Sequence, residues 1–327
     1  MTEPADDSAV REGAAIGSIS PRVQIAVAGA DRAVYLQGLL TNDIQSLAPG
    51  TGCYAAWLTP QGRMLTDMHV LQSSGMILMD VPADLGAATL ARLDQFLFAE
   101  DVRLESMAEG MTSVWLHGPQ AAAVISNVVS GCSRSTLAEW TNYQHGTATF
   151  GGDPVSIARI DQLGVPGYCV FLARASERPF AEAAVAAGAR VVSPDAIHAA
   201  RIEEGYPVFG VDMTNDTIPL EAGIEQRAVS FTKGCFVGQE VIVRVVHRGG
   251  GRVARKLVGF KLGGAATAGA KVYSGEREVG FVTSATISPT LGPIALGYVH
   301  RDFTAAGAAV LVDGQPASVT ALPMSRR

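Results

Sequence analysis

One cysteine of this chain lies in a segment whose residue types could do chemistry. Residues 233–240 read Lys233-Gly234-Cys235-Phe236-Val237-Gly238-Gln239-Glu240, so that a lysine and two glycines surround a single thiol. If a helix begins at Gly238-Gln239-Glu240, Cys235 lies just before its positive end. Together with Lys233, this position favours the thiolate, which is the reactive form of cysteine. The β-branched run Val241-Ile242-Val243 favours a strand instead, and the sequence leaves both structures open.

A free cysteine is most often a small buried apolar residue. The flanking Lys-Gly and Gly-Gln-Glu do not fit simple core packing, so we predict that Cys235 is the working thiol and that Lys233 assists it. The other cysteines lie in apolar or strand-like surroundings and are predicted to be buried: Cys53, Cys132 and Cys169. No CxxC pair occurs, and the six histidines show no metal-ligand spacing, so we expect neither a disulfide scaffold nor a metal site.

Composition sets the class of protein. A length of 327 residues with 48% hydrophobic residues is enough for two or three domains and more than one core. The net charge of -6, with no basic cluster beyond residues 244–256, disfavours direct binding to nucleic acid. No signal peptide and no apolar run of about 18 residues is present, so a cytoplasmic protein without a membrane partner is expected.

The elements that must position Cys235 follow from hydrophobic periodicity. Strand patterns occupy residues 23–28, 53–58, 64–72 and 75–80, with helices predicted over 32–40 and 82–98. A second set comprises strands at 112–116, 154–160 and 168–173 and helices at 121–129 and 175–188. Strands followed by helices, twice over, indicate two related α+β units.

The pattern changes near residue 256, where short β-rich runs separated by Gly and Pro turns indicate a small barrel or sandwich. We expect a flexible tail over residues 1–20, two α+β modules over 21–250 and a C-terminal β-barrel over 251–327. The boundary is placed at Gly249-Gly250-Gly251, because consecutive glycines make a flexible connection.

The segment around Cys235 resembles the K-G-C-[FY]-x-G-Q-E signature of the YgfZ family of folate-binding proteins, relatives of the aminomethyltransferase (T-protein) of the glycine cleavage system. The likeness covers about residues 22–325. Other segments that resemble the family are Gly29-Ala30-Asp31-Arg32, Tyr35-Leu36-Gln37-Gly38, Leu58-Thr59-Pro60-Gln61-Gly62-Arg63, Arg201-Ile202-Glu203-Glu204-Gly205 and Ala295-Leu296-Gly297-Tyr298.

This resemblance implies an aminomethyltransferase-like ring of two α+β modules and a C-terminal β-barrel around a central cavity that holds tetrahydrofolate or a derivative. It implies that Glu203 pairs with the pterin ring, that Gln239 is a further folate contact and that Arg244 attracts the glutamate tail. The residues alone favour a solvated helix charge at Glu203, and at Arg244 they are equally compatible with an exposed arginine that binds no ligand. As partners, the resemblance implies folate and either iron–sulfur client enzymes or cluster-assembly proteins.

The function that the resemblance implies is an accessory one: support of iron–sulfur clusters in client enzymes, including radical enzymes that modify tRNA, through Cys235. The alternative is a tetrahydrofolate-dependent aminomethyltransferase or related one-carbon transfer enzyme. Asp67 is the candidate catalytic carboxylate for it, although Thr66 stands where aminomethyltransferases carry a second aspartate. A strand-end turn residue at Asp67 is a further interpretation. A third possibility is a redox-sensing protein with a degenerate folate site.

Overall fold

Apolar residues at every second position build the first sheet of the molecule. The computed structural model describes residues 3–247 and 252–324. The sheet has the order β3-β4-β5-β2-β6, and all its pairs are antiparallel. Its strands are β2 (Arg22–Ala28), β3 (Thr51–Leu58), β4 (Met64–Gln72), β5 (Met76–Pro82) and β6 (Arg103–Ser106). One face packs against helices α2 (Arg32–Leu39) and α3 (Gly86–Asp94) through a core that includes Val27, Trp57 and Met79.

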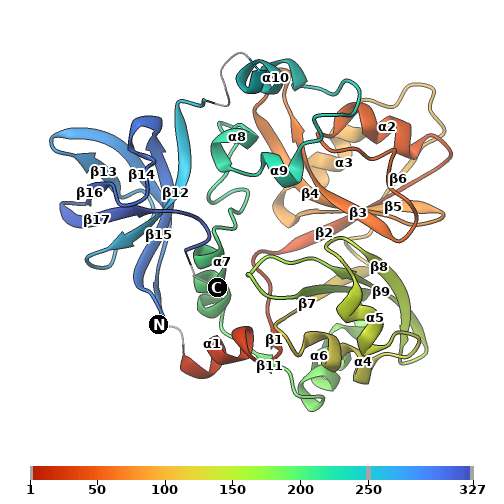
Figure 1. Ribbon diagram of the computed structural model, residues 1–327. Helices are drawn as coiled ribbons and strands as arrows, with labels where there is room; N and C mark the ends of the chain where they lie inside the picture. The colour runs from red at the N-terminus through yellow and green to blue at the C-terminus, as the bar shows by residue number, and fades with distance from the viewer. Residues whose placement is uncertain (1–2, 248–251, 325–327) are drawn as a thin grey trace.

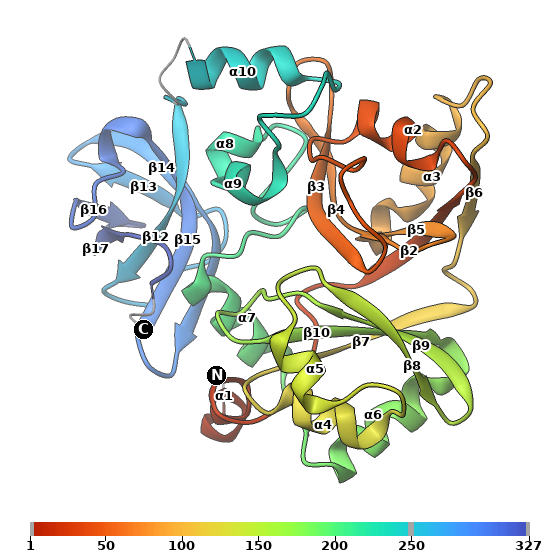
Figure 2. The ribbon, with the colours of Figure 1, turned by 45° about the vertical axis from the view of Figure 1, so that its right-hand side comes forward.

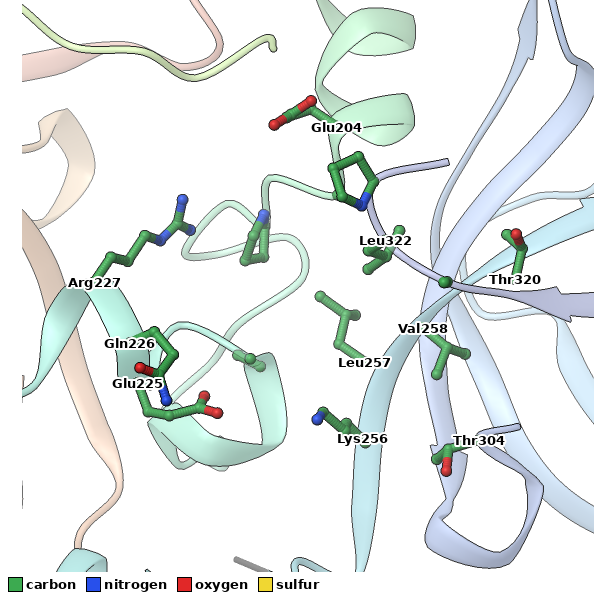
Figure 3. Close-up of a pocket in the computed structure, with 16 residues that line it drawn as sticks. Glu204, Glu225, Gln226, Arg227, Lys256, Leu257, Val258, Thr304, Thr320 and Leu322 are labelled. Atoms are coloured by element: carbon green, nitrogen blue, oxygen red, sulfur yellow. The ribbon is translucent and has the colours of Figure 1, made fainter. Parts of the chain in front are cut away.

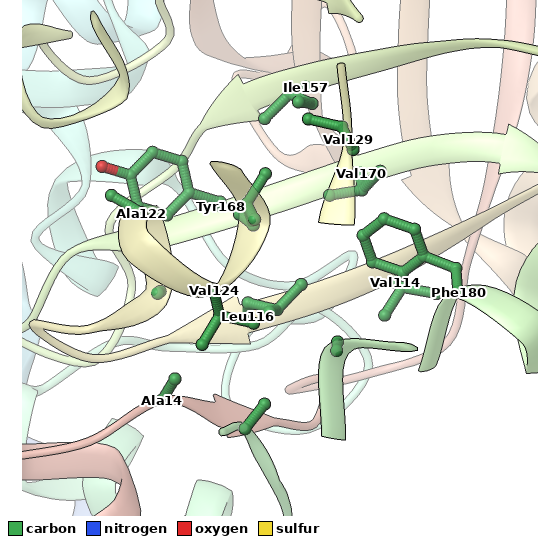
Figure 4. Close-up of a cluster of buried hydrophobic side chains, with 14 of the residues drawn as sticks. Ala14, Val114, Leu116, Ala122, Val124, Val129, Ile157, Tyr168, Val170 and Phe180 are labelled. Carbon is green, nitrogen blue, oxygen red and sulfur yellow. The ribbon is translucent and has the colours of Figure 1, made fainter. Parts of the chain in front are cut away.

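The second module is a six-stranded sheet of order β11-β1-β7-β10-β9-β8. Its strands are β1 (Ala15–Ile16), β7 (Met111–His117), β8 (His145–Phe150), β9 (Asp153–Arg159), β10 (Gly167–Ala173) and β11 (Arg190–Val191). Helices α4 (Ala121–Val128), α5 (Arg134–Glu139) and α6 (Glu177–Ala186) cover one face. Figure 4 shows the core beneath them, where Val124 and Phe180 meet Leu116 and Val170 of the sheet.

The C-terminal strands form a closed barrel of order β12-β15-β14-β13-β16-β17. They are β12 (Arg255–Leu262), β13 (Lys271–Ser274), β14 (Arg277–Ser288), β15 (Gly292–His300), β16 (Ala309–Val312) and β17 (Gln315–Thr320). Closure leaves no strand of the barrel with an unpaired edge. The expectation of two α+β modules followed by a β-barrel is confirmed.

A helical segment joins the three parts in the middle of the molecule (Figure 1). It comprises α7 (Pro194–Glu204), α8 (Pro219–Ala222), α9 (Glu225–Ala228) and α10 (Gln239–His247). Arg201 of α7 donates hydrogen bonds to Asp212 (2.8 Å) and to Ser284 of the barrel (2.8 Å). The barrel is therefore tied to the modules by buried polar contacts as well as by the chain.

The predicted flexible tail over residues 1–20 is wrong. Residues Pro4–Arg11 form helix α1, and residues Ala15–Ile16 form strand β1. Asp6 accepts hydrogen bonds from Arg190 (2.7 Å) and from the Ser193 amide (2.8 Å), while Arg11 forms an ion pair with Glu203. The partners that order this segment lie about 190 residues away, so its local composition does not reveal them.

One further expectation needs correction, and another concerns residues outside the part of the chain that the structure describes. The helix predicted over 82–98 is shorter, because α3 ends at Asp94 and the Glu100 carboxylate then binds the amides of Phe98 and Ala99 in a turn. The boundary predicted at Gly249-Gly250-Gly251 lies outside the described residues.

Candidate functional site

The second face of the first sheet carries polar residues toward the interior. Strand registry places Gln24, Asp80, His69 and Tyr54 opposite one another across β2, β5, β4 and β3. Successive residues of a strand point to opposite faces, so this row shares the face that α2 and α3 do not cover. All four residues are buried. The sheet therefore presents a polar row to the middle of the molecule.

Arg22 organises the carboxylates on this face. Its guanidinium donates to the Asp80 carboxylate (2.6 Å) and lies 3.5 Å from Asp67. Burial alone would raise the pKa of Asp80, but the charge of Arg22 and the hydrogen bond with His69 hold that pKa below its ordinary value. Burial, and next the charge of Arg22, lowers the pKa of His69, so a neutral imidazole lies 2.9 Å from Asp80.

Asp67, the candidate catalytic carboxylate, lies on this inner face. It is 3% exposed, and it accepts a hydrogen bond from the Tyr54 hydroxyl at 2.7 Å. With Arg22 on its other oxygen, the carboxylate is already bound on both sides. Asp67 is a structural partner in this state of the molecule, and its catalytic role stays a prediction.

Arg227 connects this interior to a cavity. Its guanidinium lies 4.9 Å from the Tyr54 ring and 4.0 Å from the Tyr206 ring. The same side chain lines a cavity of about 540 Å³ between the helical segment and the barrel (Figure 3). Glu204 reaches the cavity from α7, Glu225 and Arg227 from α9, and Lys256 from β12.

Nε of Arg227 and Oε2 of Glu225, on two side chains that line this cavity, are buried without a hydrogen-bond partner in the described part of the chain. Buried polar atoms are rarely unpartnered in native proteins, and ordered water or a ligand commonly supplies the missing partner. One of the two atoms donates and the other accepts. The side chains that line the cavity, among them Glu225, Arg227 and Lys256, offer a ligand both acceptors and donors.

The three predicted folate contacts lie elsewhere. Glu203 is buried, and its carboxylate binds Arg11 and the Ser288 hydroxyl, which donates at 2.5 Å. Gln239 begins α10, and Arg244 is exposed on the same helix. Figure 2 shows α10 above α8 and α9, on the side away from α7. None of the three residues is among those that line the 540 Å³ cavity, so their role as folate contacts stays a prediction.

The thiol of Cys235 is exposed, and it precedes a helix. Of the two structures left open, residues 239–247 adopt the helix, with Ile242 buried and Val245 and Val246 packed on the same side. Gly238 has φ +84°, and a Cβ there would lie 2.5 Å from the Thr59 carbonyl oxygen, so this position requires glycine. The backbone of the Thr59 turn therefore approaches Gly238 closely.

Lys233 anchors the loop that carries Cys235. Its ammonium donates to the carbonyls of Gln37 (2.6 Å), Leu40 (2.6 Å) and Asn42 (2.8 Å), at the end of α2. The amide of Val237 donates to Gly38, so the loop is fixed on both sides of Cys235. The described contacts of Lys233 are those of an anchor, and its predicted effect on the Cys235 thiolate stays a prediction.

Replacement of Lys233 by methionine should destabilise the protein, because three carbonyls lose their donor at a cost of about 1–3 kcal/mol. Burial lowers the pKa of Lys233 from 10.5 to about 8 in the folded protein. Between about pH 8 and pH 10.5 the unfolded chain therefore binds more protons at Lys233 than the folded protein does. The contribution of Lys233 to the free energy of unfolding then rises with pH over this range. The measurement is urea unfolding of the wild type and Lys233→Met at pH 7 and pH 10. The difference in their free energies of unfolding should be larger at pH 10. An identical difference at both pH values would contradict a buried titrating lysine.

The other cysteines are less available. Burial raises the pKa of Cys53 to about 12, and it also raises the pKa values of Cys132 and Cys169. Cys169 is buried, whereas Cys53 and Cys132 are half-buried. Within the described residues, Cys235 is therefore the thiol best placed to react with another molecule.

Sequence reasoning singled out Asp67 and Cys235 but missed the residues around them. The residues that sequence reasoning missed are Arg22, His69, Asp80, Glu225 and Arg227. Polar residues at alternate positions of apolar strands, such as Arg22 with Gln24 and Asp67 with His69, were a usable signal for a polar inner face. No sequence pattern marked Glu225 or Arg227, because only the fold brings α9 to the barrel.

The described residues contain no group of three or more His, Cys, Asp or Glu side chains that could hold a metal ion. In the same residues, no helix has both the length and the apolar character needed to cross a membrane.

Comparison with known proteins assigns both parts of the chain. Residues 4–233 match the GCVT N-terminal domain, and residues 255–325 match the glycine cleavage T-protein C-terminal barrel domain. An aminomethyltransferase of Rubrobacter xylanophilus is 33% identical, over 99% of this chain and 86% of the relative. One from Thermosynechococcus vestitus is 30% identical, over 98% of this chain and 87% of the relative.

Among solved structures, the glycine cleavage system aminomethyltransferase T from Bartonella henselae superposes with a TM-score of 0.85. It is 24% identical in sequence, and the match covers 99% of this chain and 91% of that one. This likeness shows the shared fold.

Proposed function

We propose that this chain binds a tetrahydrofolate in the 540 Å³ cavity. The chain belongs to the glycine cleavage T-protein (GCVT) family of aminomethyltransferase-like proteins. Small-molecule sites commonly have volumes of about 300–1,000 Å³. A reduced pterin is a flat ring with N–H donors on one edge and a carbonyl acceptor beside them. Glu225, Arg227 and Lys256 line this cavity and offer acceptors and donors that complement those groups, and this observation carries the proposal.

We further propose that the folate-bound protein is an accessory factor that supports iron–sulfur clusters in client enzymes, including enzymes that modify tRNA. The exposed thiol of Cys235 on an anchored loop supports this activity, because the loop presents a nucleophile to a partner protein instead of to the interior. A single thiolate does not hold a cluster alone, since clusters take about four ligands. Cys235 would therefore act with a client or a cluster-assembly protein.

A second candidate is aminomethyl or other one-carbon transfer to tetrahydrofolate, which the names of the curated relatives favour. Asp67 is the carboxylate available for it. Its two oxygens are already engaged by Arg22 and Tyr54, so this carboxylate is held as a structural partner. Thr66 stands where aminomethyltransferases carry a second aspartate, which also weakens this candidate. The thiol of Cys235 would have no part in this reaction.

A turnover assay separates the two candidates. We expect calorimetry to detect tetrahydrofolate binding, and we expect no formation of methylenetetrahydrofolate when an aminomethylated lipoyl carrier is supplied. Asp67→Asn, which keeps the hydrogen bond to Tyr54 possible but removes the charge, should retain binding within about threefold. Robust turnover that Asp67→Asn abolishes and Cys235→Ala retains would establish the one-carbon enzyme instead. If the folded protein binds no folate, both candidate functions are wrong.

A further inference from the structure

Strand β6 forms one edge of the first sheet. It pairs antiparallel with β2, it is the last strand in the order of the sheet, and within the described residues no strand pairs with its other side. Figures 1 and 2 show β6 on the outer side of the molecule, opposite the barrel. An exposed strand edge presents free amides and carbonyls that can pair with another strand. A further strand can therefore be added to the sheet at β6.

The hydrogen bonds of the sheet show which backbone groups of β6 point outward. The Met107 amide donates to the Gln24 carbonyl at 2.9 Å, and these two residues continue the register that pairs β6 with β2. Hydrogen-bonded pairs alternate along an antiparallel ladder, so Arg103, Glu105 and Met107 direct their backbone groups to β2. The amide and the carbonyl of Leu104 therefore point away from the sheet, toward solvent.

Two opposite charges flank Leu104 on this strand. Arg103 and Glu105 share the face of β6 opposite Leu104, because successive strand residues point to opposite faces. Both residues are exposed, and neither takes part in an ion pair within the described part of the chain. A second β6 strand that runs antiparallel and is centred on Leu104 places each Arg103 opposite the Glu105 of the other copy. Opposite charges directly across a strand pair attract each other, so this edge complements a copy of itself.

The other face of β6 borders an apolar groove of about 580 Å³ between this strand and helix α3. Ile25, Leu90 and Leu104 line the groove, and the small side chains of Ala87 and Ala91 form its exposed wall on α3. A twofold axis through the strand pair keeps the grooves of both copies on the same face of the joined sheet. The helix α3 of each copy then lies on the same side as the other groove, so that a second copy covers apolar surface as well as the strand edge.

We propose that β6 is the binding surface for a second copy of this chain, in a twofold-symmetric dimer that joins the two five-stranded sheets into one. Leu104 of each copy exchanges backbone hydrogen bonds with Leu104 of the other, and the cross-strand pair of Arg103 with Glu105 forms twice, because a twofold interface repeats every contact. The dimer is independent of the proposed folate binding, since the groove and the 540 Å³ cavity share no lining residue.

Sedimentation velocity of the full chain over a range of protein concentrations tests this interface. The wild type should form a dimer whose dissociation constant rises with salt, because the charge pairs are exposed. R103E and E105R each set like charges opposite one another twice, and each should raise the dissociation constant at least about tenfold. The double variant R103E/E105R restores opposite charges in the same register and should return to within about threefold of the wild type. K261E, at an exposed position of the barrel strand β12, is the matched control and should leave the dimer unchanged.

All these substitutions lie at exposed positions, so circular dichroism should show every variant folded like the wild type. A wild type that sediments as a monomer at every concentration overturns the proposal. A dimer that R103E and E105R leave unchanged also overturns it, because the second copy then binds at another surface. If both single variants dissociate the dimer and the double variant does not restore it, the register centred on Leu104 is wrong.

Discussion

Replacing Cys235 by serine should reduce rescue of an iron–sulfur enzyme to the level of the empty vector, a loss of at least tenfold, in cells that lack this gene. The substitution exchanges sulfur for oxygen at an exposed position, so neither packing nor the Lys233 anchor is disturbed. Only the nucleophilic thiolate is lost. The measurement is client-enzyme activity per cell at matched expression of wild type and variant.

The matched control for this experiment is Cys132→Ser, which removes a half-buried thiol in the second module. It should rescue like the wild type. Purified Cys235→Ser should unfold at the wild-type temperature and bind tetrahydrofolate with wild-type affinity. Equal rescue by Cys235→Ser and wild type would show that the thiol is dispensable and would move attention to the cavity. Failure of the wild type to rescue would instead favour the one-carbon candidate.

Replacing Arg22 by methionine should lower the free energy of unfolding by about 3–5 kcal/mol, because the change leaves buried negative charge unpaired. Arg22 donates to the carboxylate and to the backbone carbonyl of Asp80 (both 2.6 Å) and also lies against Asp67. Burial would then raise the pKa of Asp80, opposed only by its remaining partners His69 and Gln24. The measurement is urea unfolding at pH 7, followed by the intrinsic tryptophan signal.

Arg178→Met is the matched control for this prediction, since Arg178 pairs with Glu182 on the surface of α6 with 89% of its side chain exposed. Surface pairs contribute little, so this variant should unfold like the wild type. Addition of Asp80→Asn to Arg22→Met should recover part of the loss, because it removes the stranded charge. If Arg22→Met lowers the free energy of unfolding by less than about 1 kcal/mol, water solvates Asp80 on the inner face and the prediction is wrong.

The architecture could be predicted from the sequence because the strands of both modules alternate apolar residues over five or more positions, a pattern that local sequence displays. The helix at residues 239–247 was ambiguous for a physical reason. Its β-branched residues favour a strand, but Ile242, Val245 and Val246 recur at helical spacing and pack into one cluster. Tertiary packing therefore outweighed the intrinsic preference of these residues for a strand.

The site was predictable only where a motif marked it. Cys235 stood out through its glycines and lysine, whereas the partner of Lys233 is the end of a helix about 190 residues earlier. The ordered N-terminal segment was missed for the same reason, since Asp6 and Arg11 find their partners beyond residue 189. Glu225 and Arg227 become candidates only when the fold shows that both side chains line a cavity beside the barrel.

Glu203 is the point where the two ends of the folded chain meet. Arg11 near the start binds its carboxylate, and the Met324 amide near the end donates to its backbone carbonyl at 2.6 Å. Contacts that share one residue are energetically coupled, so disturbances at the two ends should not add independently. Substitutions at Arg11 and at Met324 therefore act on the same residue of α7, and a strain introduced at one contact is transmitted to the other through a single side chain and its carbonyl.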